Sequence, residues 1–169
     1  MNEITMIADR LELSVYDILD AAQTKWNFLP FYPGLVGGHC IGVDPYYLAQ
    51  CSLQKGLHPQ IILSGRHINE TMFLFFAHQI EKRIPKGGVL AVLGLTFKEN
   101  VPDLRNSQVV KLIRYLKPHY EVHVYDPLAD PKEALALYGL ELLPDWPPHI
   151  RYDGIVAVSY THLTLPTKA

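Results

Sequence analysis

Apolar residues recur at helical intervals through the first half of the 169-residue chain. Over residues 4–11 the recurring positions are Ile4, Ile7, Ala8 and Leu11, and they predict a first helix. Ser14 is placed to begin a second short helix, in the manner of a capping box, that fades near Thr24. A third helix is expected from Pro45 until just before Gly56, because glycine commonly follows the C-terminus of a helix.

A longer helix is predicted over residues 59–84. Its apolar residues repeat at spacings of three, four and seven, with polar and charged residues between them. The apolar positions are Ile61, Ile68, Met72, Phe75, Phe76 and Ile80. Such a stripe is typical of packing against a core, and the run Pro85-Lys86-Gly87-Gly88 marks the end of the helix.

Beyond residue 88 the pattern changes to an alternation of strands and helices. The continuous apolar run 89–97 predicts a strand covered on both faces, as in a parallel sheet. The elements expected after it are a helix at 107–116, a strand at 121–125, a helix at 131–138 and a strand at 153–158. This order is that of a βαβ-type domain.

The chain is therefore predicted to be an α/β protein with two parts. Residues 1–85 form an all-helical domain, and residues 86–158 form a truncated Rossmann-like domain with a parallel sheet. Residues 159–169 break the alternation, and we expect them to be a non-native tail without a role in the fold.

Charge and composition exclude several classes of partner. The chain has 15 basic and 17 acidic residues, which are interspersed, so it offers no electrostatic footprint for nucleic acid or an anionic membrane. No apolar stretch reaches the roughly 18 to 20 residues of a membrane span, and no basic segment precedes an apolar one at the N-terminus. We expect a cytoplasmic protein.

The cysteines and histidines do not indicate a disulfide or a metal site. Only two cysteines are present, in different local settings, and Cys51 is expected to pack within a helix. The eight histidines show no paired spacing of the kind that zinc ligands have. We therefore predict no bound metal.

A glycine-rich loop around Cys40 is the first candidate for chemistry. Four glycines lie within residues 34–42, which lets the backbone approach a ligand closely, and Asp44-Pro45 is typical of an N-cap followed by the first helical position. Cys40 would then lie at a helix N-terminus beside a carboxylate, as a nucleophile for covalent oxidation or acyl transfer requires. The alternative is a buried, inert cysteine with Asp44 only capping the helix.

A second candidate site follows the first predicted strand. The segment 94–107 lacks the glycines of a dinucleotide fingerprint, but Lys98 and Arg105 come after the carboxyl end of a parallel strand, where nucleotides bind in open sheets. The alternative is a solvated basic pair beside the crossover. Asp126 ends the next strand, either as a ribose ligand or as the start of a turn with Pro127, and we favour the turn.

Both segments resemble the UDP-glucose/GDP-mannose dehydrogenase family. The first resembles the pattern Pro-Gly-x-x-x-Gly-Gly-x-Cys-x-x-x-Asp from Pro33 to Asp44, with one residue fewer between Gly34 and the glycine pair, and the second matches Gly-x-x-Phe-Lys followed seven residues later by arginine. The variant running from Phe31 to Leu48 is most similar to the branch that acts on UDP-N-acetylhexosamines of gluco, galacto or manno configuration. The resemblance covers residues 2–158, equivalent to the middle and C-terminal domains of such enzymes.

The resemblance implies roles for particular residues. Cys40 would be the nucleophile and Asp44 would assist water, whereas His39 would only shape the loop. The backbone from Phe31 to Gly37 would wrap the sugar, Phe97 and Lys98 would hold UDP, and Arg105 would reach NAD on a separate domain. The residues of that sugar-wrapping segment are Phe31, Tyr32, Pro33, Gly34, Leu35, Val36 and Gly37.

For the whole enzyme the resemblance implies oxidation of the sugar C6 alcohol to a carboxylate, with two NAD and a cysteine thioester. The chain lacks a Gly-x-Gly-x-x-Gly turn, and the family's catalytic lysine would lie upstream of Asn2, so we expect an inactive fragment of that enzyme. The alternatives are a non-catalytic UDP-binding or assembly module and a UDP-glucose 6-dehydrogenase. Thiol redox chemistry is disfavoured because no resolving cysteine lies nearby. A homodimer through the long helix is expected.

Overall fold

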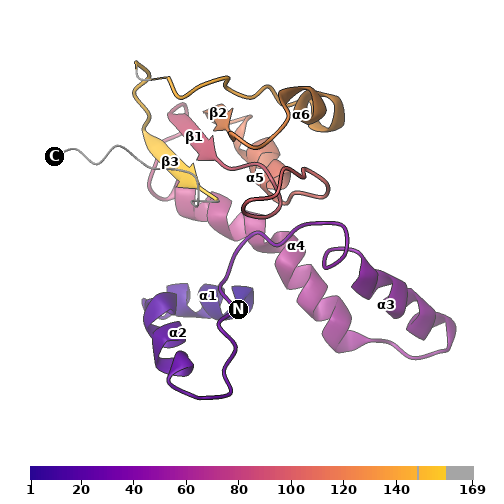
Figure 1. Cartoon of the computed structure of the whole chain (residues 1–169). Coiled ribbons are helices and arrows are strands. Elements are labelled where there is room, and N and C mark those ends of the chain that lie inside the picture. The colour runs from indigo at the N-terminus through magenta and orange to yellow at the C-terminus, as the bar shows by residue number, and fades with distance from the viewer. Residues whose placement is uncertain (148, 159–169) are drawn as a thin grey trace.

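The structure is a computed structural model, which describes residues 1–147 and 149–158. Four helices form its first half: α1 (Asn2–Arg10), α2 (Val15–Gln23), α3 (Asp44–Gln54) and α4 (Gln60–Glu81). Helix α4 is the longest and runs diagonally through the molecule, with α1 and α2 beside one part of it and α3 alongside its N-terminal end (Figure 1). The four predicted helices are confirmed.

The helix N-termini differ in how they are capped. Ser14 accepts a hydrogen bond from the backbone N–H of Asp17, as the predicted start of α2 requires. The prediction that Asp44 caps α3 is wrong: Val43 occupies the cap position without a side-chain bond, and Asp44 is already the first helical residue. The backbone N–H of Asp44 instead donates to the carbonyl of Cys40 at 2.8 Å. This bond joins the glycine-rich loop around Cys40 (residues 34–42, the cysteine loop) directly to the helix.

The second half is built on a parallel sheet. Its elements are β1 (Val89–Leu93), α5 (Val109–Leu116), β2 (Glu121–Tyr125), α6 (Pro131–Tyr138) and β3 (Gly154–Ala157). The strand order is β2-β1-β3, and both pairings are parallel. The α/β fold class and the order of elements are confirmed, whereas the domain boundaries stay a prediction and the predicted tail lies outside the described residues.

The first strand is shorter than its apolar run. We predicted a strand to Phe97, but β1 ends at Leu93, and Gly94 then has a φ of +98°. This left-handed conformation turns the chain out of the sheet at no steric cost to glycine. Residues Leu95 and Thr96 remain buried because the loop folds back over the end of the sheet, so their burial reflects tertiary packing and not strand structure.

One face of the sheet packs against helices α4 and α5. Leu90 of β1 lies in a cluster with Ala77 of α4 and Leu112 of α5, and Phe73 and Phe76 of α4 pack against it. The predicted apolar stripe of the long helix is therefore core over its C-terminal part, where the helix passes beneath the sheet (Figure 1). A second cluster joins α5 and α6 to Val92, on the same face of β1 as Leu90.

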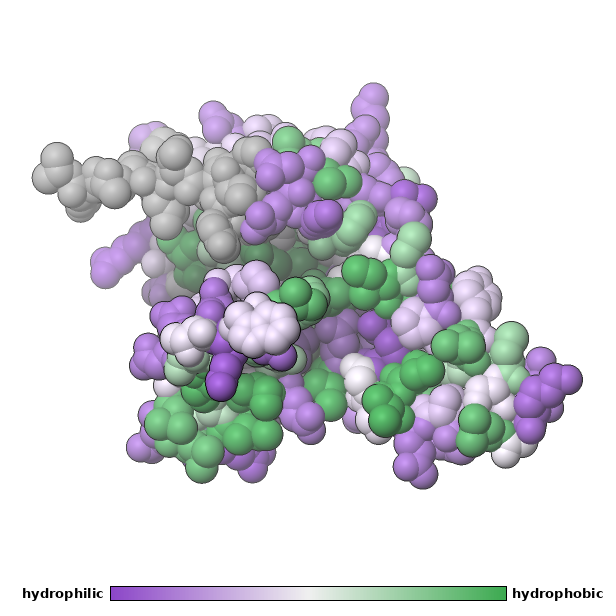
Figure 2. Space-filling model, turned by 60° about the horizontal axis from the view of Figure 1, so that its bottom comes forward, coloured by the Kyte–Doolittle hydropathy of each residue, from purple (hydrophilic) through white to green (hydrophobic). Residues whose placement is uncertain are grey.

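The N-terminal end of the long helix and the helices beside it expose apolar side chains. Hydrophobic residues gather over α1 and α2 and again over α3 (Figure 2). Cys51 lies in α3 but is exposed, so the prediction that it packs is wrong. Within residues 1–147 and 149–158, no helix is both long and apolar enough to cross a bilayer.

Candidate functional site

Besides the backbone bonds to the Cys40 carbonyl, the cysteine loop is held by side chains from other elements. Asn2 of α1 donates through Nδ2 to the Gly34 carbonyl and accepts from the Gly34 N–H through Oδ1, both at 2.9 Å. These two hydrogen bonds are equivalent to the two that a residue of a neighbouring antiparallel strand would make with Gly34. Asn2 is buried and also donates to Oδ1 of Asn69, 67 residues away in α4.

Helix α4 holds the next two points of the loop. Asn69, which accepts a hydrogen bond from Asn2, in turn donates Nδ2 to the Val36 carbonyl at 2.9 Å. One turn earlier, Arg66 donates Nη1 to the Ile41 carbonyl at 3.2 Å, and its guanidinium lies 5.8 Å from the ring centre of Tyr46. Arg66 is buried, and its Nε and Nη2 have no hydrogen-bond partner within the described part of the chain.

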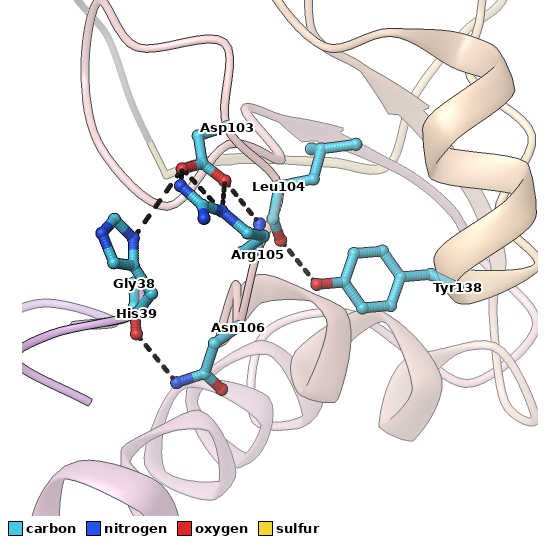
Figure 3. Close-up of polar contacts among 7 residues, drawn as sticks. All are labelled: Gly38, His39, Asp103, Leu104, Arg105, Asn106 and Tyr138. Carbon is cyan, nitrogen blue, oxygen red and sulfur yellow. Dashed lines mark hydrogen bonds and ion pairs between the residues drawn. The ribbon is translucent and has the colours of Figure 1, made fainter. Parts of the chain in front are cut away.

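The loop after β1 approaches the cysteine loop from the other side. Asn106 donates Nδ2 to the Gly38 carbonyl at 3.1 Å (Figure 3). A Cβ on Gly37 would lie 2.5 Å from the Asn106 carbonyl oxygen, and a Cβ on Gly38 would lie 2.8 Å from the Phe97 ring. Gly38 also has a φ of +93°, so two of the loop's glycines are required by close approach and backbone conformation.

Asp126 fixes the loop that carries Phe97 and Lys98. Its Oδ2 accepts the backbone N–H groups of Leu95 and Thr96 at 2.6 and 2.9 Å, and its Oδ1 accepts the N–H of Leu128. The bond to Leu128 makes the turn that we favoured. The carboxylate is buried and occupied by backbone donors, which leaves it unsuited to a ribose.

The two loops together enclose a cavity of about 260 Å³. Gly34, Leu35, Val36 and Gly37 of the sugar-wrapping segment line one wall, and Phe97 and Lys98 line the other. The remaining lining residues are Ile41, Thr96, Glu99, Val109 and Val158. Segments about 60 residues apart in sequence, which we assigned to one ligand, thus meet at one cavity.

Other predicted site residues lie around this cavity. Phe31 and Tyr32 are exposed and line a separate hollow of about 440 Å³ against α1 and α4. Cys40 is an exposed free thiol, and Asp44, four residues later, is also exposed. Neither residue lines the cavity. The alternative that Cys40 is buried is therefore wrong, whereas its role as a nucleophile stays a prediction.

Arg105 is paired with a carboxylate beside the cysteine loop. Its Nη2 lies 2.6 Å from Oδ2 of Asp103, and its Nε contacts both oxygens of that group (Figure 3). Hydrogen bonds from the Arg105 side chain and backbone hold the pKa of Asp103 at about 2, and Asp103 in turn raises the pKa of Arg105. His39 Nδ1 lies 3.9 Å from the same carboxylate, and its ring meets Phe97 edge to face.

The contacts of Asn2, Asn69, Asn106 and Asp103 were not predicted from the sequence. Asparagine and aspartate are common on surfaces and in turns, so their types gave no signal. Asn106 has a left-handed backbone with a φ of +52°, which asparagine tolerates better than most residues, but that requirement is not visible in the sequence. Within the described residues, no three His, Cys, Asp or Glu side chains are grouped to hold a metal.

The lowered pKa of Asp103 predicts how the pair with Arg105 responds to acid. Its stabilising contribution is complete above the ordinary aspartate pKa of 3.8 and is lost as the pH falls through about 2. A carbon-13 NMR titration of the Asp103 carboxyl is expected to show a midpoint near 2, moving toward 3.8 in Arg105→Gln. A wild-type midpoint at 3.8 would contradict the pairing.

Comparisons with known proteins agree with this geometry. Residues 1–71 match the central domain of the UDP-glucose/GDP-mannose dehydrogenase family, and residues 91–163 match the UDP binding domain of the same family. The chain is similar to protein CapL of Staphylococcus aureus, with 49% identity over 150 residues, covering 85% of this chain and 35% of that protein.

Two further relatives cover more of the chain. UDP-N-acetyl-D-glucosamine 6-dehydrogenase of Pseudomonas aeruginosa is 45% identical over 163 residues, covering 92% of this chain and 38% of that protein. The structure of a UDP-glucose dehydrogenase from Pyrobaculum islandicum superposes with a TM-score of 0.80 at 27% identity, covering 93% of this chain and 38% of that one. The chain thus spans little more than a third of the length of these relatives, and it belongs to the UDP-glucose/GDP-mannose dehydrogenase family.

Proposed function

We propose that the chain forms the cysteine-bearing and UDP-binding part of an NAD-dependent UDP-N-acetylhexosamine 6-dehydrogenase. One observation carries the proposal: the cysteine loop and the Phe97–Lys98 segment line the same cavity. The names of the relatives from P. aeruginosa and Salmonella typhi, both UDP-N-acetyl-D-glucosamine 6-dehydrogenases, support the hexosamine.

The cavity suits the nucleotide end of such a substrate. Phe97 offers an apolar ring, and Lys98 is an exposed cation at the carboxyl end of β1, where a parallel sheet receives phosphates. The wall formed by residues 34–37 presents backbone, because the amides of Asn2 and Asn69 hold it in place. A sugar lying along that wall would extend toward Ile41 and so toward Cys40.

Cys40 would carry the covalent steps. The C6 alcohol is first oxidised to an aldehyde, and the Cys40 sulfur then adds to the aldehyde carbon to give a thiohemiacetal. Loss of hydride from that carbon leaves a thioester. Water attacks the thioester, the carbon–sulfur bond breaks, and the thiol and the sugar carboxylate are released. Asp44, exposed at the first position of α3, would take a proton from that water.

NAD, when bound, would accept the hydride in each of the two oxidations. The residue of this chain that fits it is Arg105, an exposed guanidinium suited to a pyrophosphate. Asp103 holds that guanidinium in one orientation beside the cysteine loop. Because the 169 residues contain no Gly-x-Gly-x-x-Gly turn, we expect the chain alone to oxidise no UDP-sugar.

UDP binding tests the role of Lys98. Isothermal titration calorimetry of the chain with UDP should give a Kd that rises about tenfold or more in Lys98→Ala, since a charge-assisted hydrogen bond contributes about 1.5–3 kcal/mol. Lys86→Ala is the matched control, because Lys86 is exposed just before the opposite end of β1. Equal Kd values for wild type and Lys98→Ala would show that UDP does not use this cavity.

The chemical role of Cys40 requires a cofactor domain. In a fusion in which this chain replaces the matching part of the P. aeruginosa relative, Cys40→Ser is expected to lower formation of the sugar acid by roughly a thousandfold or more. Cys51→Ser is the control, since that thiol lies on the outer side of α3. Full NADH and acid production by Cys40→Ser would rule out a thioester.

We also propose that the chain forms a homodimer through its helical part. Ile61, near the start of α4, is 90% exposed, and α3, which contacts α4, exposes apolar side chains as well (Figure 2). Ile61→Glu should shift the protein toward monomer in sedimentation equilibrium. Leu135→Glu, at an exposed apolar position of α6, should not. A wild-type chain that is monomeric at high micromolar concentration would refute the dimer.

A further inference from the structure

The segment that carries Cys40 is held at both of its flanks. Two residues before the thiol, the Gly38 carbonyl accepts from Asn106 at 3.1 Å, and one residue after it, the Ile41 carbonyl accepts from Arg66 at 3.2 Å. The two donors come from different parts of the fold. Arg66 belongs to helix α4, whereas Asn106 belongs to the loop between β1 and α5 that also carries Phe97 and Lys98.

Asn106 reaches both ends of this segment. A Cβ on Gly42 would lie 2.5 Å from the Asn106 Nδ2 atom, so the amide sits against Gly42 while it donates to Gly38. Its backbone carbonyl lies just as close to the position of a Cβ on Gly37. Gly37, Gly38 and Gly42, on both sides of Cys40, thus all lie against Asn106.

The loop that bears Asn106 is itself tightly determined. Phe97 N–H donates to the Asp103 carbonyl, and Ser107 donates its hydroxyl to the Leu95 carbonyl at 2.6 Å, which closes the loop at its base. Arg105, the preceding residue, is fixed by Asp103. The amide of Asn106 is therefore presented from a rigid support, as a positioning group must be.

We propose that Asn106 is a positioning residue for Cys40, acting through the Gly38 carbonyl. The inference rests on the proposed function and deepens it: the loop that binds UDP also sets the place of the thiol that attacks the sugar. The role belongs to the amide donor and not to the left-handed backbone, because the hydrogen bond to Gly38 comes from the side chain.

The experiment follows the two thiols of the chain itself. Cys40 and Cys51 are both exposed, so iodoacetamide labelling read by peptide mass spectrometry gives the rate of Cys40 with Cys51 as an internal reference. Asn106→Gly keeps the left-handed backbone and removes the amide, and Asn106→Asp keeps the shape and removes the donor. In both variants we expect the ratio of the Cys40 labelling rate to the Cys51 labelling rate to change by threefold or more. The dependence of this ratio on pH should change as well. Exchange of the 38–42 amides should quicken about fivefold, as loss of one hydrogen bond allows.

Asn100 supplies the matched control. It lies in the same loop with a φ of +60°, so Asn100→Gly and Asn100→Asp repeat the backbone and charge changes without the contact to Gly38. These variants should leave the labelling ratio and the 38–42 exchange rates as in wild type. Gly42→Ala disturbs the contact from the other side, since its Cβ would meet the amide of Asn106, and is expected to act like the Asn106 variants.

The outcomes separate this inference from the proposed function. Unchanged labelling and exchange in both Asn106 variants, or equal changes in the Asn100 variants, would overturn it. So would a parallel change at Cys51 with a lowered melting temperature, because that marks general loosening. The assay uses neither UDP-sugar nor NAD, so failure of UDP binding or of acid formation would refute the proposed function while leaving the positioning result to stand on its own.

Discussion

The cysteine loop depends on side chains that take the place of a backbone ladder. Between Gly34 and Ile41 the chain belongs to no helix or sheet, yet its polar groups need partners wherever water is excluded. Three asparagines and one arginine supply those partners, at Gly34, Val36, Gly38 and Ile41. Because the four donors come from three separate elements, the loop has one conformation only when α1, α4 and the β1–α5 loop are all in place.

The opposite wall of the cavity is also held by a side chain, but this side chain accepts hydrogen bonds from the backbone instead of donating them. There a buried carboxylate, Asp126, accepts the backbone N–H groups that the chain frees when it leaves β1 at Gly94. An ionised acceptor makes such bonds stronger than neutral groups do. Side-chain donors hold carbonyls on one side and a carboxylate holds N–H groups on the other, so side chains from distant elements fix the backbone of both walls.

The sequence predicted the elements better than it predicted these contacts. The strand at 121–125 and the helix at 131–138 agree with β2 and α6, because their apolar periodicity is local. Strand β1 was placed too long because burial of Leu95 and Thr96 comes from the returning loop. Asn2 and Asn69 are 67 residues apart, and nothing in either neighbourhood points to the other. The family resemblance assigned Phe31 and Tyr32 to the same sugar-wrapping segment as Gly34, but they line a different hollow.

A cavity whose walls come from two parts of a chain keeps its shape only if something fixes one wall to the other. Packing contributes through Phe97, whose ring fills the space that a side chain at position 38 would need. Packing alone allows sliding, since dispersion forces have little directionality. The hydrogen bond from Asn106 to the Gly38 carbonyl is directional and crosses between the walls beside the thiol. It fixes the register between the two loops, so the position of Cys40 relative to the opposite wall of the cavity is set by the fold.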